Sequence, residues 1–326
     1  MKNHAVDNTS ISVVIATHDR HPELRALLCD LGAQDVQPDE VIVVDSDQAT
    51  DSRLVVKEAS ADGLPVRHLL APNVLATKRN HGVLAAQGDL IVILDDDLRV
   101  GRGFLAAHSA AHAGRPKTIA SGPITFPEDW VAASNYYRFK QGRHSANDAD
   151  ESLVPPHRFV AMNHSIRREA YLSIGGYDDD YQMYGGEDLD FGHRAKRHGM
   201  HLALAPGADA EHHEVRMTWT TYFNKVHKAA YYGLPLVLTK NPESVSIPTV
   251  QAIGGGPATD ARTRLLRAAL AVGSQRTSMR HLASAFERLD AHSRAFTPRA
   301  YMGATLMANR IGLIEQRKGA PYEPLI

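Results

Sequence analysis

The chain has 326 residues, of which 43% are hydrophobic and 22% are charged, with a formal net charge of −1 at pH 7. This composition is that of a globular protein with enough apolar surface for a large core. The balanced charge disfavours non-specific nucleic-acid binding, and the single cysteine, Cys29, excludes a disulfide within the chain. No apolar run approaches the roughly 20 residues of a membrane span. We expect no nucleic-acid partner, no transmembrane segment and a cytoplasmic protein, peripheral to a membrane at most.

The first hundred residues alternate short apolar runs with amphipathic stretches. The runs are rich in Val and Ile and predict strands, whereas the 3.6-residue apolar period between them predicts helices. Strands are expected at 11–16, 40–44, 66–70 and 90–94, and helices at 21–34, 50–61 and 75–87. Strands and helices that alternate through short connections predict an α/β fold with a mostly parallel sheet and helices on both faces.

The pattern changes after residue 100. Here we expect helices at 104–113, 169–174 and 187–198 and extended segments at 118–125, 159–167 and 201–205. The polar stretch 141–156 predicts a loop, which is either a lid or an insertion. From residue 217 the pattern is mainly helical, with helices expected at 219–232, 258–272, 278–291 and 298–316. We therefore predict one domain over residues 1–216 and a helical C-terminal extension over 217–326, which packs on the core, forms a homodimer or holds a substrate.

Polar side chains follow three of the predicted strands at the point where each strand ends. Thr17 and Asp45 follow the first two strands, and Asp95, Asp96 and Asp97 follow the fourth. Ligands of open α/β sheets bind outside the carboxyl ends of the strands, where these side chains would meet. Mg²⁺ and Mn²⁺ take oxygen ligands and often bridge carboxylates to a diphosphate. The alternative is a solvated turn, or acids that cap the helix that follows.

The sequence Gly185-Gly186-Glu187-Asp188 is a second candidate feature. Two glycines allow a tight approach of the backbone to a ligand. The acids fall in the first turn of a predicted helix, where negative charge is favourable, and this alone would account for them. In a catalytic interpretation Asp188 is a general base, which the helix end keeps ionised at neutral pH.

Two further segments carry candidate ligands. In Glu211-His212-His213-Glu214 the adjacent histidines point to opposite faces of a strand, so only one of them faces a shared site. A neutral imidazole is a frequent metal ligand, although a lone histidine is more often a packing residue. The choice between His212 and His213 stays open. Arg79, at the start of a predicted helix, either contacts a phosphate or base or pairs with a nearby acid.

Taken in order, these motifs resemble the GT-A nucleotide-sugar glycosyltransferases, nearest the inverting family two, over about residues 11–215. The motifs are VVIATHDR at 13–20, VIVVD at 41–45, KRN at 78–80 with Gly82, the three acids at 95–97, IGGYD at 174–178, and GGEDLD at 185–190 with Arg194. The second half is also similar to the β-1,4-galactosyltransferases and the polypeptide N-acetylgalactosaminyltransferases. In both groups a Gly-Gly-Glu box precedes a metal-binding histidine.

The resemblance implies a GT-A fold: a Rossmann-like, mostly parallel sheet flanked by helices, with a nucleotide-binding half near 11–100 and an acceptor half near 101–216. It implies Mn²⁺ or Mg²⁺ as cofactor, with Asp97 as the direct ligand, Asp95 in the same motif and His212 completing the site. The implied nucleotide-sugar contacts are Thr17, Asp45, Arg79, Asp95 and Asp96. The implied catalytic residues are Asp188, which deprotonates the acceptor, and Glu187, which holds the acceptor or the sugar.

The resemblance also implies a reaction. The donor is a nucleoside-diphosphate sugar, a UDP-sugar before others, and the acceptor is a hydroxyl of a glycan, small metabolite or peptide. The residue after the box glutamate is Asp188, as in the inverting galactosyl enzymes, which favours single displacement with inversion. A retaining transferase, a nucleotidyltransferase and a non-catalytic sugar- or nucleotide-binding homologue are the alternatives. A nucleotidyltransferase is disfavoured because Thr17-His18-Asp19-Arg20, after the first strand, contains no glycine.

Overall fold

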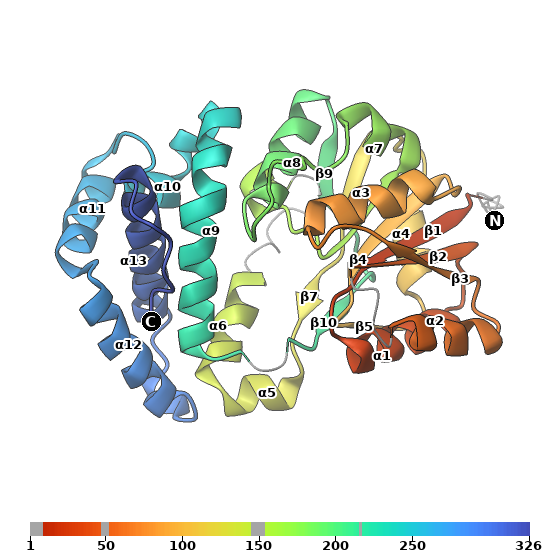
Figure 1. The fold of residues 1–326 in the computed structure, drawn as a ribbon, viewed down its shortest axis with the longest axis horizontal. Helices are drawn as coiled ribbons and strands as arrows, with labels where there is room; N and C mark the ends of the chain where they lie inside the picture. The colour runs from red at the N-terminus through yellow and green to blue at the C-terminus, as the bar shows by residue number, and fades with distance from the viewer. Residues whose placement is uncertain (1–8, 47–51, 145–153, 215–216) are drawn as a thin grey trace, which may run out of the picture. The chain divides into compact units, whose positions relative to one another are not determined.

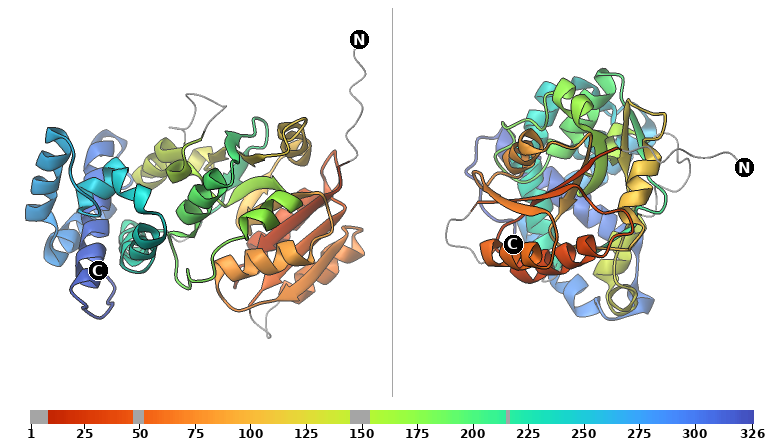
Figure 2. Two further views of the ribbon diagram at one scale, coloured as in Figure 1. Left: turned by 90° about the horizontal axis from the view of Figure 1, so that it is seen from above. Right: turned by 90° about the vertical axis from the view of Figure 1, so that its right-hand side faces the viewer.

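The computed structural model describes residues 9–46, 52–144, 154–214 and 217–326 (Figures 1 and 2). The chain forms two compact units: a sheet unit of residues 1–127, 144–179 and 191–213, and a helical unit of residues 128–143, 180–190 and 214–326. The chain enters the helical unit for the last time at Glu214, close to the expected boundary at 216. Residues 128–143 and 180–190 also belong to the helical unit. Within the described ranges no helix combines the length and the apolar character needed to cross a membrane.

The sheet unit is built on a seven-stranded sheet in the order β3-β2-β1-β4-β8-β6-β9. Its strands are β1 (Ile11–Ala16), β2 (Glu40–Asp45), β3 (Val66–Leu70), β4 (Leu90–Asp95), β6 (Thr118–Ser121), β8 (Asn163–Arg167) and β9 (His201–Leu204). Only β8 runs antiparallel to its neighbours in this sheet, β4 and β6. The expected mostly parallel α/β sheet is confirmed.

Helices cover both faces of this sheet. The sheet-unit helices are α1 (His21–Gly32), α2 (Ser52–Ala61), α3 (Leu75–Ala85), α4 (Phe104–Ala111), α7 (Arg168–Ile174) and the 3₁₀ turn η2 (Pro156–Arg158), and α8 (Glu187–Arg197) enters the unit at Phe191. Side chains of successive strand residues point to opposite faces of the sheet. Val13 packs with α1 and α2, whereas Val14 packs with α3. Figure 1 shows α1 and α2 on one side of the strands and α3 on the other. The continuous apolar runs follow from this burial on two faces.

A second, three-stranded sheet has the order β5-β10-β7. Its strands are β5 (Leu98–Val100), β7 (Ile124–Thr125) and β10 (Ala210–His212). Strand β10 pairs antiparallel with β5, so that His212 lies opposite Leu98. Segments of two or three residues are too short to show a period, so β5 is absent from the sequence prediction.

The helical unit is formed by helices from two parts of the chain, together with residues 180–190, which include the start of α8. They are α5 (Glu128–Ala133), α6 (Asn135–His144), α9 (Trp219–Lys240), η3 (Pro242–Ser246), α10 (Pro248–Ile253), α11 (Ala261–Gly273), α12 (Arg276–Leu289), η4 (Ser293–Ala295) and α13 (Pro298–Arg317). Aromatic side chains fill the centre, where the rings of Trp219 and Tyr301 stack with their centroids 4.4 Å apart.

Helix α6 corrects part of the loop expected over 141–156. Residues 141–144 continue a helix instead, because Tyr136 and Phe139 of the same segment are buried against α9. Residues 145–153 of that expected loop lie outside the described residues, and the interpretation as a lid falls mainly on them.

Candidate active site

The carboxyl ends of three parallel strands form one edge of the sheet unit. Ala16 at the end of β1 is paired with Val44 of β2 on one side and with Asp95 of β4 on the other. Thr17, Asp45 and the three acids that begin at Asp95 therefore come together, as the strand pattern predicted. Strand order changes direction at β1, between β2 and β4, which is the position where open α/β sheets bind ligands.

Asp96 lies at the centre of this edge and is buried. Thr17 Oγ1 donates a hydrogen bond of 2.7 Å to its Oδ2, and Arg20 Nη1 lies 3.2 Å from its Oδ1. Burial raises the pKa of Asp96 to about 7, against the opposing effect of the Arg20 guanidinium, and the neighbouring Asp97 raises it further. The pKa of this carboxyl group is thus set by its burial and by the charges of Arg20 and Asp97 beside it.

Arg20 was not predicted as a site residue. Its guanidinium contacts both Asp96 and Asp97. Asp19, the residue before it, adopts a left-handed backbone conformation with φ of 53°, which turns the chain at the end of β1. Burial would lower the pKa of Arg20, but Asp97 and its two neighbouring acids raise it, so the side chain is a fixed positive charge at the acids. Arg20 is the last residue of the motif VVIATHDR, and this position was the sequence signal that could have identified it.

Asp97 and His212 form a buried pair. His212 Nε2 lies 3.2 Å from Asp97 Oδ1, and both side chains are about 95% buried, with side-chain exposures of 5% and 4%. The β5–β10 pairing brings them together, and the backbone N–H of His213 donates to the carbonyl of Asp97 at 2.8 Å. The ring of His213 points elsewhere, with Nε2 2.6 Å from Glu211 Oε1. The structure thus brings His212, and not His213, to the acids.

The pair offers one oxygen and one nitrogen donor. Mg²⁺ and Mn²⁺ are commonly held by one or two protein ligands together with substrate phosphates, and the pair fits that requirement. Asp95 is not assembled with the pair, because its Oδ1 accepts from Arg79 Nη2 at 3.0 Å. Across the described residues no cluster of three or more His, Cys, Asp or Glu side chains has the arrangement of a metal site. Of the three ligands expected from the sequence, Asp97 and His212 lie in contact, and Asp95 is paired with Arg79 in this structure.

Asp45 is the last residue of β2, and Lys78 belongs to α3. Asp45 is fully buried and accepts from the backbone N–H of Ser46 at 2.6 Å and from the hydroxyl of Ser52. Lys78 Nζ donates to the carbonyl of Thr17 at 2.7 Å. Burial lowers the pKa of Lys78, while Asp45 raises it. Lys78 was not predicted, although it is the first residue of the KRN motif.

The third residue of that motif, Asn80, holds the turn of the IGGYD motif. Its Nδ2 donates to the carbonyl of Tyr177 and its Oδ1 accepts from the N–H of Tyr177, both at 2.8 Å. Tyr171 donates to the same Oδ1 at 2.6 Å. Gly176 has φ of 69°, and a Cβ there would lie 2.6 Å from Asn80 Oδ1. The two motifs are therefore one structural connection between α3 and the segment after α7.

Glycines shape the second feature, in the helical unit. Gly185 and Gly186 have φ of 101° and 100°, which side chains rarely adopt. A Cβ on Gly185 would lie 2.4 Å from the Cβ of Ala229, and one on Gly233 would lie 1.8 Å from the carbonyl oxygen of Gly185. The turn is thus packed tightly onto α9, and glycine is needed on both sides of the contact.

Helix α8 begins at this turn with the two predicted catalytic acids. Glu187 is buried and its Oε2 accepts from the backbone N–H of Gly185 at 3.1 Å, whereas Asp188 is half-buried. Glu187 therefore stabilises the turn that sets the position of Asp188.

A buried charged cluster that the sequence did not predict surrounds Glu214. Lys225 Nζ lies 2.9 Å from its Oε1, Lys140 Nζ lies 3.3 Å from its Oε2, and the hydroxyl of Tyr136 donates to Oε2 at 3.2 Å. The cluster joins α6 to α9 within the helical unit.

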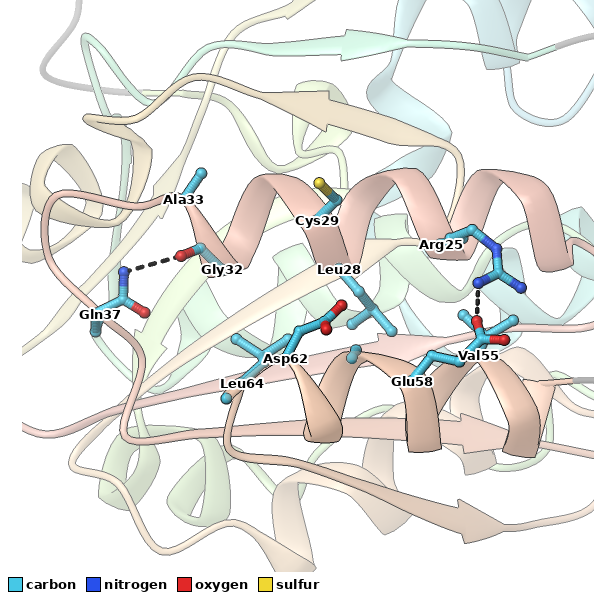
Figure 3. Close-up of a pocket in the computed structure, with 12 residues that line it drawn as sticks. Arg25, Leu28, Cys29, Gly32, Ala33, Gln37, Val55, Glu58, Asp62 and Leu64 are labelled. Carbon is cyan, nitrogen blue, oxygen red and sulfur yellow. Dashed lines mark hydrogen bonds and ion pairs between the residues drawn. The ribbon is translucent and has the colours of Figure 1, made fainter.

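A pocket of about 650 Å³ lies elsewhere on the sheet unit, between α1 and α2. Figure 3 shows Leu28, Cys29 and Leu64 in its lining and an ion pair between Arg25 and Glu58 across it. None of the predicted site residues lines it.

Known proteins resemble this chain in sequence. Residues 12–171 match the model of glycosyl transferase family 2, and residues 144–218 match the N-terminal domain of galactosyltransferase. Validoxylamine A glucosyltransferase of Streptomyces hygroscopicus subsp. limoneus is 26% identical over 62% of this chain and 52% of its own length. N-acetylglucosaminyl-diphospho-decaprenol L-rhamnosyltransferase of Mycobacterium tuberculosis is 25% identical over 69% of this chain and 83% of its own. The chain spans only about half the length of the validoxylamine enzymes.

Solved structures share the fold. The mannosyltransferase PcManGT of Pyrobaculum calidifontis, in complex with GDP-Man and Mn²⁺, aligns with a TM-score of 0.63 at 16% identity, over 96% of this chain and 88% of its own. GalNAc-T7, solved with UDP, GalNAc and Mn²⁺, aligns with a TM-score of 0.50 at 16% identity, over 74% and 52%. Both are glycosyltransferases of the GT-A fold, so the fold expected from the motifs is confirmed.

Proposed function

We propose that this chain, whose residues 12–171 match glycosyl transferase family 2, moves a sugar from a nucleoside-diphosphate sugar to an acceptor hydroxyl with the help of a divalent cation. The observation that carries this proposal is the buried Asp97–His212 pair, 3.2 Å apart, beside the strand ends where such folds bind ligands. Mn²⁺ is the favoured ion, since it accepts an imidazole ligand more readily than Mg²⁺ and both structural neighbours named above contain it.

The donor contacts are proposed at the same strand ends. Thr17, Asp45 and Arg79 are placed at the nucleotide, with Asp96 at the ribose and Asp95 held by Arg79. PcManGT was solved with GDP-Man and GalNAc-T7 with UDP. The assay should therefore compare UDP-sugars with other donors.

Charge on the leaving diphosphate needs compensation in the reaction. A bound divalent cation supplies this as a Lewis acid. Asp97 and His212 would hold the ion, with Asp95 of the same motif as the further predicted ligand. Arg20 adds a fixed positive charge beside Asp96 and Asp97, which offsets the repulsion between these two adjacent acids.

Asp188 is proposed as the general base. In an inverting single displacement its carboxylate removes the proton of the acceptor hydroxyl while the acceptor oxygen forms a bond to the anomeric carbon and the bond to the diphosphate oxygen breaks. Asp188 lies in the first turn of α8, where negative charge is favourable, and the hydrogen bond from Gly185 to Glu187 fixes the turn before it.

Turnover tests the proposal. The chain is incubated with UDP-, GDP- and dTDP-sugars and an acceptor panel that includes validoxylamine A and a prenyl-diphosphate-linked N-acetylglucosamine, the acceptor types named in the relatives above. We expect release of the nucleoside diphosphate with Mn²⁺ and none with EDTA, and a product with inverted anomeric configuration by NMR.

The variant Asp188→Asn separates catalysis from binding. We expect kcat to fall about 10²–10⁴-fold, as for loss of a general base, with the affinity for nucleotide unchanged. A retained anomeric configuration would contradict the role of Asp188, and nucleotide binding without any turnover would support the non-catalytic alternative.

A further inference from the structure

Helix α11 of the helical unit carries an apolar stripe on its solvent side. Leu265 is 73% exposed and Val272 is 79% exposed, the two largest values among the exposed large apolar side chains of the described residues. The stripe consists of Leu265, Ala268, Ala269 and Val272, all exposed and spaced at i, i+3, i+4 and i+7. The opposite side of the helix, with Thr263 and Leu270, is buried. The helix is therefore apolar on two sides, and only one of them packs within the chain.

Positive charge accompanies this stripe. Residues 261–286 contain five arginines and no Asp or Glu, although the whole chain has a net charge of −1. Two of the five have partners inside the unit: Arg267 donates to the carbonyl of Gln251, and Arg276 pairs with Glu315. The others, Arg262, Arg264 and Arg280, are exposed.

The two arginines of α11 border the stripe. At 100° per residue, Arg262 and Arg264 project on opposite sides of the line through Leu265 and Val272. Arginine side chains in this position can lay their methylene groups along apolar surface and extend their charged ends to anions. Within the helical unit, α13 lies between α11 and α9, and α11 forms one edge of the unit (Figures 1 and 2).

We propose that α11 docks on the surface of a bilayer that contains anionic lipids. The stripe would enter the boundary between headgroups and acyl chains, and Arg262 and Arg264 would contact lipid phosphates. Charge complementarity selects this occupant over a second copy of the chain. A symmetric contact through α11 would bring the same arginines of both copies together, and the acid nearest to them, Asp260, accepts hydrogen bonds from Thr263 of its own helix.

Vesicle flotation of the full chain tests the proposal. The vesicles are pure phosphatidylcholine, or 70% phosphatidylcholine with 30% phosphatidylglycerol, at 50 and 300 mM NaCl. We expect at least tenfold stronger binding to the anionic vesicles at 50 mM NaCl, and weaker binding at 300 mM because salt screens the arginines. Equal binding to both vesicles, or none to either, would overturn the proposal.

Paired variants identify the surface. Leu265→Ser with Val272→Ser should reduce binding at least tenfold, and Arg262→Gln with Arg264→Gln should reduce it by about fivefold per arginine. The matched controls are Leu84→Ser, at a side chain that is 62% exposed on α3, and Arg115→Gln with Lys117→Gln, and neither should change binding.

Self-association is measured by light scattering without lipid. A monomeric wild type, with the same mass in the Leu265→Ser/Val272→Ser variant, supports the proposal. A dimer that this variant dissociates would assign the stripe to a second copy and overturn it. The substituted side chains are exposed, so the variants should keep the wild-type melting temperature.

Discussion

Acidification should destabilise the sheet unit through three buried histidines on α4 and β8. His108 Nδ1 lies 2.8 Å from Ser165 Oγ and its Nε2 lies 2.9 Å from Asn163 Oδ1. His112 Nε2 lies 2.9 Å from the same Ser165 oxygen, and His164 Nδ1 donates to a backbone carbonyl at 2.8 Å. Burial lowers the pKa of His108 and of His112 to about 4 and that of His164 to about 3.

The sign and size of the effect follow from these values. The unfolded chain protonates its histidines near pH 6.5, whereas the folded chain keeps these three neutral, so unfolding takes up protons as the pH falls. Between pH 8 and pH 5 each histidine lowers the free energy of unfolding by about 2 kcal/mol, or about 6 kcal/mol together. Asp96 acts in the opposite direction, because its raised folded pKa of about 7 stabilises the folded state at pH 5 by about 3 kcal/mol. The net expected loss is about 3–4 kcal/mol.

Urea unfolding followed by circular dichroism at pH 8, 6.5 and 5 measures this loss. His108→Gln should reduce the loss in unfolding free energy between pH 8 and pH 5 by about 2 kcal/mol. The matched control His201→Gln, at an exposed position of β9, should leave it unchanged. Asp96→Asn should increase this loss, because the stabilisation that Asp96 provides at pH 5 is then absent. A loss below about 1 kcal/mol in the wild type, or the same loss in His108→Gln, would refute the reasoning.

Two packing predictions concern the motifs. Gly233→Ala should destabilise the helical unit by about 3 kcal/mol, since the new Cβ would lie 1.8 Å from the Gly185 oxygen. The control Gly303→Ala has open space around the new Cβ and should not destabilise the unit. Thermal melting compares the two variants. Asn80→Ala should cost about 2–4 kcal/mol in urea unfolding, because it leaves the N–H and carbonyl of Tyr177 and the hydroxyl of Tyr171 without this partner. A melting temperature within 2 °C or so of wild type for Asn80→Ala would contradict the role given to that motif.

Much of the fold could be predicted because its core strands are buried on two faces. Strands β1 and β3 begin and end at the predicted residues, and the fully buried run of β1 carries the stronger local signal. The parallel order followed from the alternation with helices. In contrast, α6 was missed, because its aromatic residues gain their burial from α9, which lies about eighty residues later. Such a contact is not encoded in the local pattern.

The candidate site was predictable in its residue types and less so in its pairings. The strand ends brought Thr17 and Asp96 together as expected. The selection of His212 over His213 depends on the three-residue pairing of β10 with β5, and the participation of Arg20 depends on the left-handed conformation of Asp19. The pairing of Asp95 with Arg79 is likewise a tertiary contact. Spacing along the chain determines none of these.

The most direct test of the proposed function is a thermal-shift measurement with UDP, GDP, dTDP and CDP, each with Mn²⁺ or with EDTA. Wild type, His212→Ala and the matched control His213→Ala are compared, since only His212 lies beside Asp97. We predict that one nucleotide raises the melting temperature only with Mn²⁺, that His213→Ala keeps this shift and that His212→Ala loses it. A shift that persists in EDTA, or that both variants retain in full, would contradict a metal-dependent donor site at Asp97 and His212.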